Sequence, residues 1–413
     1  MDYMSALKNF FLNFLLVLCS GIAAFAFIGY FVIKSGLITQ TPLKFHFALP
    51  PAIALLAQSS KAGTIPQNYV LIVGDSFAKG NGDWLLSADP DSNGPFHSAH
   101  VLHDLSGMDV ISFGRPGSSS IKGWVREPSS LYPFVHNVID DSFGPPDIVL
   151  AYFYAGNDPH ENALQLQDDF VPEYGDPMQA GDAAWESYLL KQIKNHKVGP
   201  YRHINTTFGW LINASADVAK KSLRSSGNES IASVHDTNST TKNRIMLQGV
   251  AADFNFGFLA PGLGLSRQQL ERSFLAVSRS LHSLRLLFPG SKLVVVYVPS
   301  PAESYRLASD HITVMEPQDV KWDHMLTAEY PVEQLLQLSD ETAERVKQIA
   351  VKEGASFVDT REDIRSASSG QLIHGPLDMT HFNQMGYTAL AGSIACHLSE
   401  QKIWDKRICP LQR

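Results

Sequence analysis

Two segments far apart in the chain carry the side chains of nucleophilic catalysis. Ser76 ends a Gly-Asp-Ser sequence that directly follows the apolar run Tyr69–Val73. Near the C-terminus, Asp378 stands three residues before His381. An aspartate at this spacing can bond the imidazole from a single turn, which fixes its tautomer and leaves the other nitrogen free as a base. The sequence predicts a Ser–His–Asp arrangement, provided that the fold brings the two segments together.

Two further segments contain groups that can stabilise an oxyanion. Gly114 and Gly117 follow the run Met108–Phe113, and glycine lets a backbone amide approach a ligand closely. Asn157 follows the run Asp147–Tyr154, and its side-chain amide can donate to an oxyanion. Taken singly, these signals are also explained by a helix N-cap, a tight turn and an Asx-turn. Their order, with three of them at strand ends, favours the catalytic interpretation.

The elements expected to position these groups alternate between apolar strands and amphipathic helices. Besides the three runs above, Lys292–Val298 and Ser356–Asp359 are typical of buried parallel strands. Ser266–Leu287 carries apolar residues at helical spacing, and Leu338–Val351 opens with Ser339 as its expected N-cap. Such alternation predicts a parallel sheet with helices on both faces. Reactive groups in these sheets gather at the carboxyl ends of the strands.

Four ordered blocks resemble those of the SGNH (GDSL-type) hydrolase family, namely Gly74-Asp75-Ser76, the glycines after Phe113, Gly156-Asn157-Asp158 and Asp378-x-x-His381. The resemblance spans roughly residues 68–159 and 290–398. It implies an α/β fold for residues 67–413, namely a flavodoxin-like three-layer αβα sandwich with a parallel sheet. The stretch 160–265 departs from minimal family members, and we expect a helical insertion there, with a helix over Trp185–His196.

The resemblance also implies a role for each block. Ser76 would be the nucleophile, and Asp378 and His381 would complete the triad. The oxyanion hole would consist of the Ser76 amide, the Gly117 amide and the Asn157 side chain, with the other glycine of that block a weaker candidate. The implied chemistry needs no cofactor and no metal.

The N-terminal region predicts a membrane anchor. Residues 10–33 form an almost unbroken apolar run, whose helical length of about 36 Å exceeds a hydrocarbon core of about 30 Å. A cleaved signal peptide and a core helix are the alternatives. Residues 1–9 would be a short tail and 35–66 a tether, with the catalytic domain outside the cytoplasm, in the periplasm or extracellular. The positive-inside rule does not decide orientation, because Lys8 and Lys34 flank the run on both sides.

Composition limits the classes of partner and ligand. The chain has 413 residues, a net charge of −8 and no block of basic residues, so we expect no nucleic-acid partner. Asp89 to Gly94 resemble the start of an EF-hand loop, but His100 occupies the position of the bidentate glutamate. A polar turn is the simpler interpretation, and we expect no metal site.

These observations favour a membrane-anchored serine esterase that hydrolyses an O-acyl ester, with acetyl as the favoured group. The expected substrate is an acylated small molecule or an envelope glycan. An O-acetyltransferase with the same triad is the first alternative. A non-catalytic subunit of a membrane complex, with a membrane protein as partner, is the second. The sequence leaves open the acyl group, the alcohol, hydrolysis against transfer, and the oligomeric state.

The three cysteines make one further prediction. Cys19 lies inside the apolar run, whereas Cys396 and Cys409 lie thirteen residues apart beyond the catalytic histidine. If the domain lies in an oxidising compartment, these two can form a disulfide. Two unpaired thiols, with Cys396 packed in the core, are the alternative.

Overall fold

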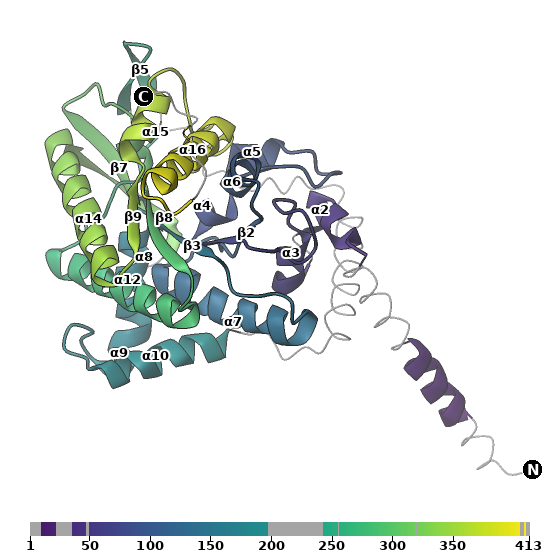
Figure 1. Cartoon of the computed structure of the whole chain (residues 1–413). Coiled ribbons are helices and arrows are strands. Elements are labelled where there is room, and N and C mark those ends of the chain that lie inside the picture. The colour runs from purple at the N-terminus through teal and green to yellow at the C-terminus, as the bar shows by residue number, and fades with distance from the viewer. Residues whose placement is uncertain are drawn as a thin grey trace, which may run out of the picture.

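A five-stranded parallel sheet forms the centre of the protein in the computed structural model (Figure 1). The structure describes residues 10–21, 35–46, 49–196, 243–254, 256–318, 321–404 and 409. The sheet has the order β2-β1-β3-β6-β9. Its strands are β1 (Val70–Val73), β2 (Val110–Ser112), β3 (Ile148–Tyr154), β6 (Lys292–Val298) and β9 (Ser356–Asp359). All five strands predicted from the apolar runs are therefore present, and the predicted α/β fold with a parallel sheet is confirmed.

The strand order locates the crevice in which a site can form. In chain order these strands run 2-1-3-4-5, the order of flavodoxin-like doubly wound sheets. Val70 pairs with Val110 on one side and with Ile148 on the other. The connections from β1 and β3 leave toward opposite edges, so a crevice opens at the carboxyl ends of these two strands.

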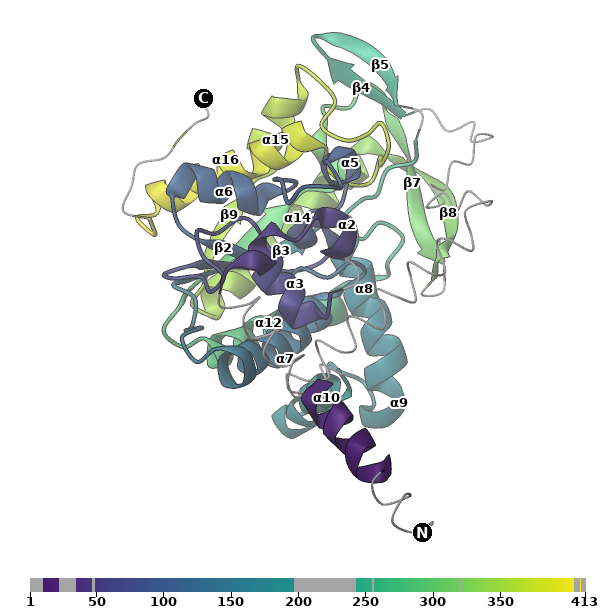
Figure 2. The ribbon, with the colours of Figure 1, turned by 90° about the vertical axis from the view of Figure 1, so that its right-hand side faces the viewer.

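Helices cover both faces of the sheet (Figures 1 and 2). Alternate strand residues point to opposite faces, so Ile72 and Leu150 belong to one apolar cluster while Leu71 and Val149 belong to the other. The first face is covered by α6 (Ser98–Ser106), α15 (Arg361–Ser368) and α16 (Gln384–Glu400). The second is covered by α3 (Pro51–Ala57), α7 (Glu127–Phe134), α12 (Arg267–Leu287) and α14 (Val332–Lys352).

The two long helices test the helix predictions. Helix α12 follows Ser266, whose hydroxyl accepts a hydrogen bond from the Gln269 amide in a capping box, as the spacing predicts. The predicted start of α14 is wrong, because the helix begins at Val332 after Pro331. Ser339 lies inside the helix, is buried, and donates to Glu303. A buried hydroxyl with a distant partner is thus indistinguishable in sequence from an N-cap.

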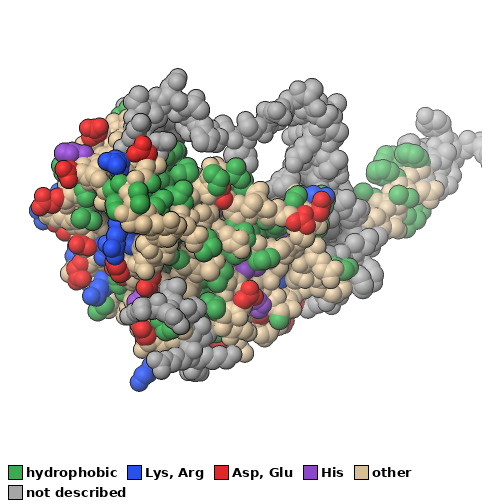
Figure 3. Space-filling view, turned by 90° about the horizontal axis from the view of Figure 1, so that it is seen from above, with side chains coloured by type: hydrophobic (Ala, Val, Ile, Leu, Met, Phe, Trp, Pro, Cys, Tyr) green, Lys and Arg blue, Asp and Glu red, His purple; other side chains and the backbone are tan. Residues whose placement is uncertain are grey.

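Smaller elements complete the described part of the chain. They are η1 (Leu37–Gln40), α2 (Leu43–His46), α4 (Ser76–Lys79), α5 (Asp83–Ser87), η2 (Ile121–Arg126), η3 (Val135–Ile139), α8 (Asp158–Gln165), η4 (Leu166–Phe170), α9 (Val171–Tyr174), α10 (Asp182–Asn195) and α13 (Pro301–Ser304). Helix α10 confirms the helix expected near Trp185. Charged side chains of both signs are interspersed on the face shown in Figure 3.

Two antiparallel hairpins lie beside the sheet (Figure 2). They are β4 (Asn243–Leu247) with β5 (Val250–Phe254), and β7 (His311–Gln318) with β8 (Lys321–Pro331). Among the described residues of the insertion 160–265, the first part is helical and the last part contains the first of these hairpins; residues 197–242 lie outside the described residues. Gln248 and Gly249 both have positive φ at the first hairpin's turn, which matches a two-residue type I′ loop. The expectation of a helical insertion missed this turn signal.

The N-terminal region differs from the expected tether. Leu55, Leu56 and Ala57 of α3 are buried in the cluster on the second face of the sheet, so the later part of residues 35–66 packs as part of the domain. Leu55 and Leu56 follow the buried Ala52 at three and four positions, so this short helix has one apolar face to bury. Residues 10–21 are helical with exposed side chains, and no helix among the described residues is long and apolar enough to cross a membrane. Residues 1–9 and 22–34 lie outside the described residues.

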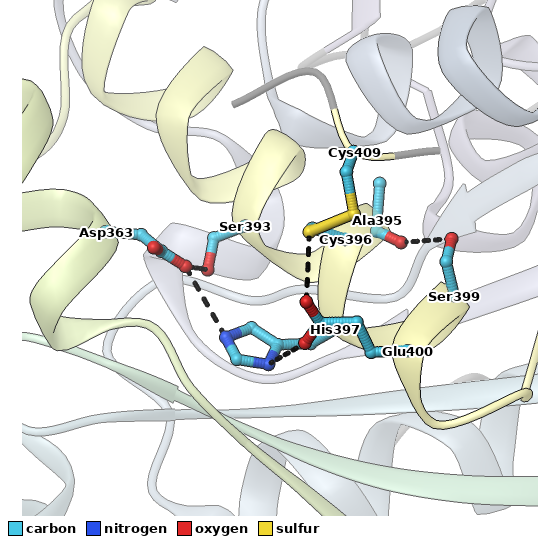
Figure 4. Close-up of a disulfide and its surroundings, with 8 residues drawn as sticks. All are labelled: Asp363, Ser393, Ala395, Cys396, His397, Ser399, Glu400 and Cys409. Carbon is cyan, nitrogen blue, oxygen red and sulfur yellow. Dashed lines mark hydrogen bonds and ion pairs between the residues drawn. A yellow bond between two sulfur atoms is a disulfide. The ribbon is translucent and has the colours of Figure 1, made fainter. Parts of the chain in front are cut away.

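The disulfide predicted between Cys396 and Cys409 is present (Figure 4). It joins α16 to the C-terminal tail, and the Cys396 sulfur lies 3.8 Å from the Glu400 carboxylate. Cys19 is a free, exposed cysteine. The sequence alternative of two unpaired thiols does not describe this structure.

Candidate active site

The three residues of the predicted triad form a continuous hydrogen-bonded chain. The Ser76 hydroxyl donates to His381 Nε2 at 2.8 Å. His381 Nδ1 donates to Asp378 Oδ2 at 2.7 Å. Ser76 and His381 are separated by 305 positions in sequence, yet both lie within reach of one reacting atom. This arrangement suits a serine nucleophile, a histidine base and an aspartate that orients the base.

The local structure around β1 presents the serine. Ser76 is the first residue of α4, and the Asp75 side chain caps this helix by accepting from the Phe77 amide at 2.9 Å. The helix ends after one turn at Gly80, which has a left-handed conformation. As the first helical residue, Ser76 has a backbone N–H without a partner inside the helix. Both its hydroxyl and its amide are thus available at the carboxyl edge of the sheet.

Asp378 is held as a carboxylate by its own loop. Its Oδ1 accepts from the Thr380 hydroxyl at 2.7 Å, the Thr380 amide at 3.0 Å and the His381 amide at 3.2 Å. Burial would raise the pKa of Asp378, but the hydrogen bond and charge of His381, with the two Thr380 donors, lower it well below its usual range. An ionised Asp378 keeps the Nδ1 proton of His381 in place and leaves Nε2 as the acceptor for Ser76.

The two glycines after β2 have different environments. A Cβ at Gly114 would collide with the backbone of Ala78 and Lys79, so this glycine allows the chain to pack against α4. Gly117 has a φ of +65°, and a Cβ there would meet no atom within 4 Å. Gly117 also lines the cleft that contains Ser76. The geometry therefore agrees with the predicted preference for Gly117 as the amide donor.

Asn157 lies in the same cleft, where Asp75 holds its amide. Its Nδ2 donates to Asp75 Oδ2 at 3.1 Å, and its Oδ1 is buried without a hydrogen-bond partner among the described residues. A carboxamide has two N–H donors, so one remains for an oxyanion.

Burial raises the pKa of Asp75, and its hydrogen bonds and the charge of His381 oppose this rise. Burial and the nearby Asp75 likewise raise the pKa of Asp158, which accepts from the Tyr154 amide.

The cleft beside Ser76 has a volume of about 310 Å³. Its polar side includes Ser76, His381 and Asn157, with Asn81 and Thr380 beside them. Its other side is an apolar wall, which we define as Phe256, Leu259 and Met315. Residues 256–259 run beside β7, with hydrogen bonds from the Phe258 amide to the Thr313 carbonyl and from the Met315 amide to the Phe258 carbonyl. Sequence reasoning missed this wall, because only strand pairing brings it to the cleft.

Trp124 and His100 do not line the cleft. Trp124 is fully buried and its indole N–H donates to the Tyr152 carbonyl at 3.0 Å, so it packs against the sheet. His100 is buried and bonds Ser59. Among the described residues, one group has metal-ligating types close together, namely Cys396, Glu400 and Cys409. The disulfide consumes both of its thiols.

Comparisons with known proteins find solved structures of low similarity. No family model and no curated protein matches the chain. LAE5, an alpha/beta hydrolase from the metagenome of Lake Arreo in Spain, is 11% identical over 83% of this chain and 98% of its own, with a TM-score of 0.32. A mutant of Axe2, an acetyl-xylooligosaccharide esterase from Geobacillus Stearmophilus, is 14% identical over 84% and 99%, with a TM-score of 0.33. The acetyl xylan esterase Est2A from Butyrivibrio proteoclasticus is 11% identical over 83% and 66%, with a TM-score of 0.32. At these scores the similarity identifies no family for the chain.

Proposed function

We propose that the protein is a serine esterase that hydrolyses an O-acyl ester through an acyl-enzyme. The observation that carries the proposal is the hydrogen-bonded chain from Ser76 through His381 to Asp378, with distances of 2.8 and 2.7 Å. It lies beside two oxyanion donors in a cleft at the carboxyl edge of the sheet. The order of the four sequence blocks supports membership of the SGNH hydrolases.

In the first half-reaction, Ser76 Oγ attacks the ester carbonyl while its proton moves to His381 Nε2. Asp378 stabilises the imidazolium through Nδ1. The tetrahedral oxyanion is held by the Ser76 and Gly117 amides and by the free N–H of Asn157. When the intermediate collapses, the imidazolium protonates the departing alcohol and the acyl group remains on Ser76.

In the second half-reaction, water takes the place of the alcohol. His381 Nε2 accepts a proton from the water as its oxygen attacks the acyl-enzyme. Collapse of this intermediate returns a proton to Ser76 Oγ and releases the acid. If a sugar hydroxyl attacks instead of water, the same groups catalyse acyl transfer, so the second nucleophile decides between the two activities.

We propose further that an acetyl ester on an envelope glycan or small molecule is the substrate, and that the domain is anchored outside the cytoplasm. The apolar run 10–33 supports the anchor. The disulfide between Cys396 and Cys409 supports an oxidising compartment. Membrane lipid would then contact the N-terminal helix, and a membrane protein partner is compatible with this location.

Turnover of p-nitrophenyl acetate by the full chain in detergent tests the activity. A fluorophosphonate probe should label Ser76, and Ser76→Ala should abolish both labelling and turnover while the fold persists. Ser87→Ala, at an exposed serine of α5, is the matched control and should behave as wild type. Labelling at a serine other than Ser76 would refute the assignment. Adding an acetylatable glycan separates hydrolysis from transfer by the product formed.

A further inference from the structure

The nucleophile and the triad acid are connected by a second route that does not pass through His381. Asp83 is the first residue of α5, and its side chain is buried with the residue 6% exposed. Its Oδ1 accepts from the Leu377 amide at 2.5 Å, and its Oδ2 accepts from the Asp378 amide at 3.0 Å. Asp83 therefore holds the backbone of the triad acid itself, across 295 sequence positions.

The segment that carries Asp83 is continuous with the nucleophile. The Asn81 amide donates to the Ser76 carbonyl at 3.0 Å, which closes the turn after α4. The Asn81 carbonyl in turn accepts from the Tyr387 hydroxyl of α16 at 2.6 Å. Gly82, between Asn81 and Asp83 in the chain, has a φ of +131°, and a Cβ there would collide with the Phe382 carbonyl. Gly82 and Asp83 thus pack directly against the loop of Asp378 and His381.

We propose that Asp83 is a positioning residue for the triad. It fixes the distance between the loop of Asp378 and the turn of Ser76, so that the His381 imidazole stays within hydrogen-bonding distance of the Ser76 hydroxyl. The inference rests on the proposed esterase function and assigns Asp83 no contact with substrate. Both of its oxygens are used by the acid's loop, and charge-assisted bonds of this kind are stronger than neutral ones.

Asparagine at this position breaks one of the two bonds. Leu377 and Asp378 donate to different oxygens of Asp83, whereas a carboxamide has one oxygen and one NH₂ group. One backbone N–H then faces a donor and is pushed away, and the loop shifts. Because misplacement of a catalytic group by about 1 Å can cost about a hundredfold in rate, we expect Asp83→Asn to lower kcat by tenfold to a hundredfold with KM little changed.

The chain offers a closely matched control at Asp109. This residue is also buried, 8% exposed, and its two oxygens accept from the Ala62 and Gln67 amides at 2.7 and 3.0 Å. It precedes β2, at the amino edge of the sheet and away from the triad. Asp109→Asn therefore makes the same chemical change, and we expect it to affect stability without lowering kcat per labelled Ser76.

The experiment measures kcat and KM for p-nitrophenyl acetate with the full chain in detergent, with active sites counted by fluorophosphonate labelling of Ser76. Asp83→Asn is also combined with Asp378→Asn. If Asp83 acts by placing the Asp378 carboxylate, Asp83→Asn should matter little once that carboxylate is gone. The fold-decrease in kcat that Asp83→Asn causes should then be at least about tenfold smaller in the Asp378→Asn background than in the wild-type background. If the two substitutions act independently, as for a purely structural role of Asp83, their fold-decreases in kcat would instead multiply.

The outcomes separate the two proposals. Wild type without turnover or Ser76 labelling refutes the esterase itself. Two outcomes overturn the role of Asp83 but leave the esterase proposal intact, provided that the wild type is active. In the first, Asp83→Asn and Asp109→Asn have the same kcat. In the second, the fold-decreases in kcat multiply in the double variant. If Asp83→Asn does not fold, Asp83→Glu keeps both acceptor oxygens but moves them by one methylene. That variant should fold and lose kcat, and a wild-type kcat would overturn the inference.

Discussion

The substitution Asp378→Asn should disturb the tautomer of the His381 imidazole while leaving the Ser76 nucleophile unchanged. Asp378 Oδ1 accepts three hydrogen bonds, from the Thr380 hydroxyl and amide and from the His381 amide, at 2.7, 3.0 and 3.2 Å. The single oxygen of the new carboxamide is required on this side. Its NH₂ group therefore faces His381 Nδ1, which in the native protein donates a hydrogen bond to Asp378 Oδ2 at 2.7 Å.

The reversed hydrogen bond changes the tautomer of His381. Nδ1 must become an acceptor, so the ring proton moves to Nε2, which lies 2.8 Å from Ser76 Oγ. The serine then faces a donor and loses its general base. For triads with this change the expected drop in kcat is about 10⁴, which at about 1.36 kcal/mol per decade corresponds to about 5.4 kcal/mol of activation free energy.

The assay is steady-state turnover of p-nitrophenyl acetate, with fluorophosphonate labelling of Ser76 to count folded sites. Labelling should remain measurable but slow, since the serine and the oxyanion donors are unchanged. Asp89→Asn, on an exposed loop, controls for loss of a carboxylate and should retain wild-type turnover. A decrease of less than about tenfold in Asp378→Asn would remove this residue from the mechanism, because tautomer reversal cannot be so mild.

Three further predictions concern the oxyanion hole, acid stability and the disulfide. Gly117→Ala should lower kcat by about 10²–10³ with a small loss of stability, because its φ of +65° disfavours alanine and the amide moves; Gly114→Ala should instead lower the melting temperature, because its Cβ collides with the α4 backbone. The folded-state pKa of Asp378 is depressed, so its ionisation stabilises the fold above the ordinary aspartate pKa of about 3.9, and the difference in unfolding free energy between wild type and Asp378→Asn should shrink as the pH falls below that value. Reducing the bond between Cys396 and Cys409 should lower the free energy of unfolding in a urea titration by about 3 kcal/mol, as expected for a loop of this length; equal stability of the oxidised and reduced forms would contradict this.

The sequence was sufficient to predict the sheet, and to predict that Ser76, His381 and Asp378 come together, because both predictions depend on local signals. An apolar run bounded by turn residues predicts a buried strand, and Ser76, Asn157 and His381 occupy short blocks that follow strands or precede a helix. The resemblance already favoured Gly117 over Gly114, and the structure adds the physical reason: Gly114 packs against α4, whereas Gly117 lines the cleft.

The remaining parts of the site depend on contacts between distant segments. Asp83 bonds a residue 295 positions away, and in the sequence it is an ordinary acidic residue at the start of a short helix. Asn243 is similar, since it is fully buried and joins the Phe256 carbonyl to both backbone groups of Thr313. Neither role follows from residue type or spacing, because each is defined by which backbone groups the fold leaves unpaired nearby.

The groups around Ser76 and the apolar wall of the cleft come from different parts of the fold. The triad and oxyanion donors follow β1, β2 and β3 or precede α16, whereas Phe256 and Met315 of the apolar wall come from the segment after β5 and from β7. Asn243 of β4 fastens these two segments to each other rather than to the triad. Sequence changes in the hairpins can therefore reshape the cleft while the distances from Ser76 to His381 and Asp378 stay fixed. If the proposed esterase function holds, changes in the hairpins and in residues 256–259 should alter the choice of ester more than the rate of the chemical step.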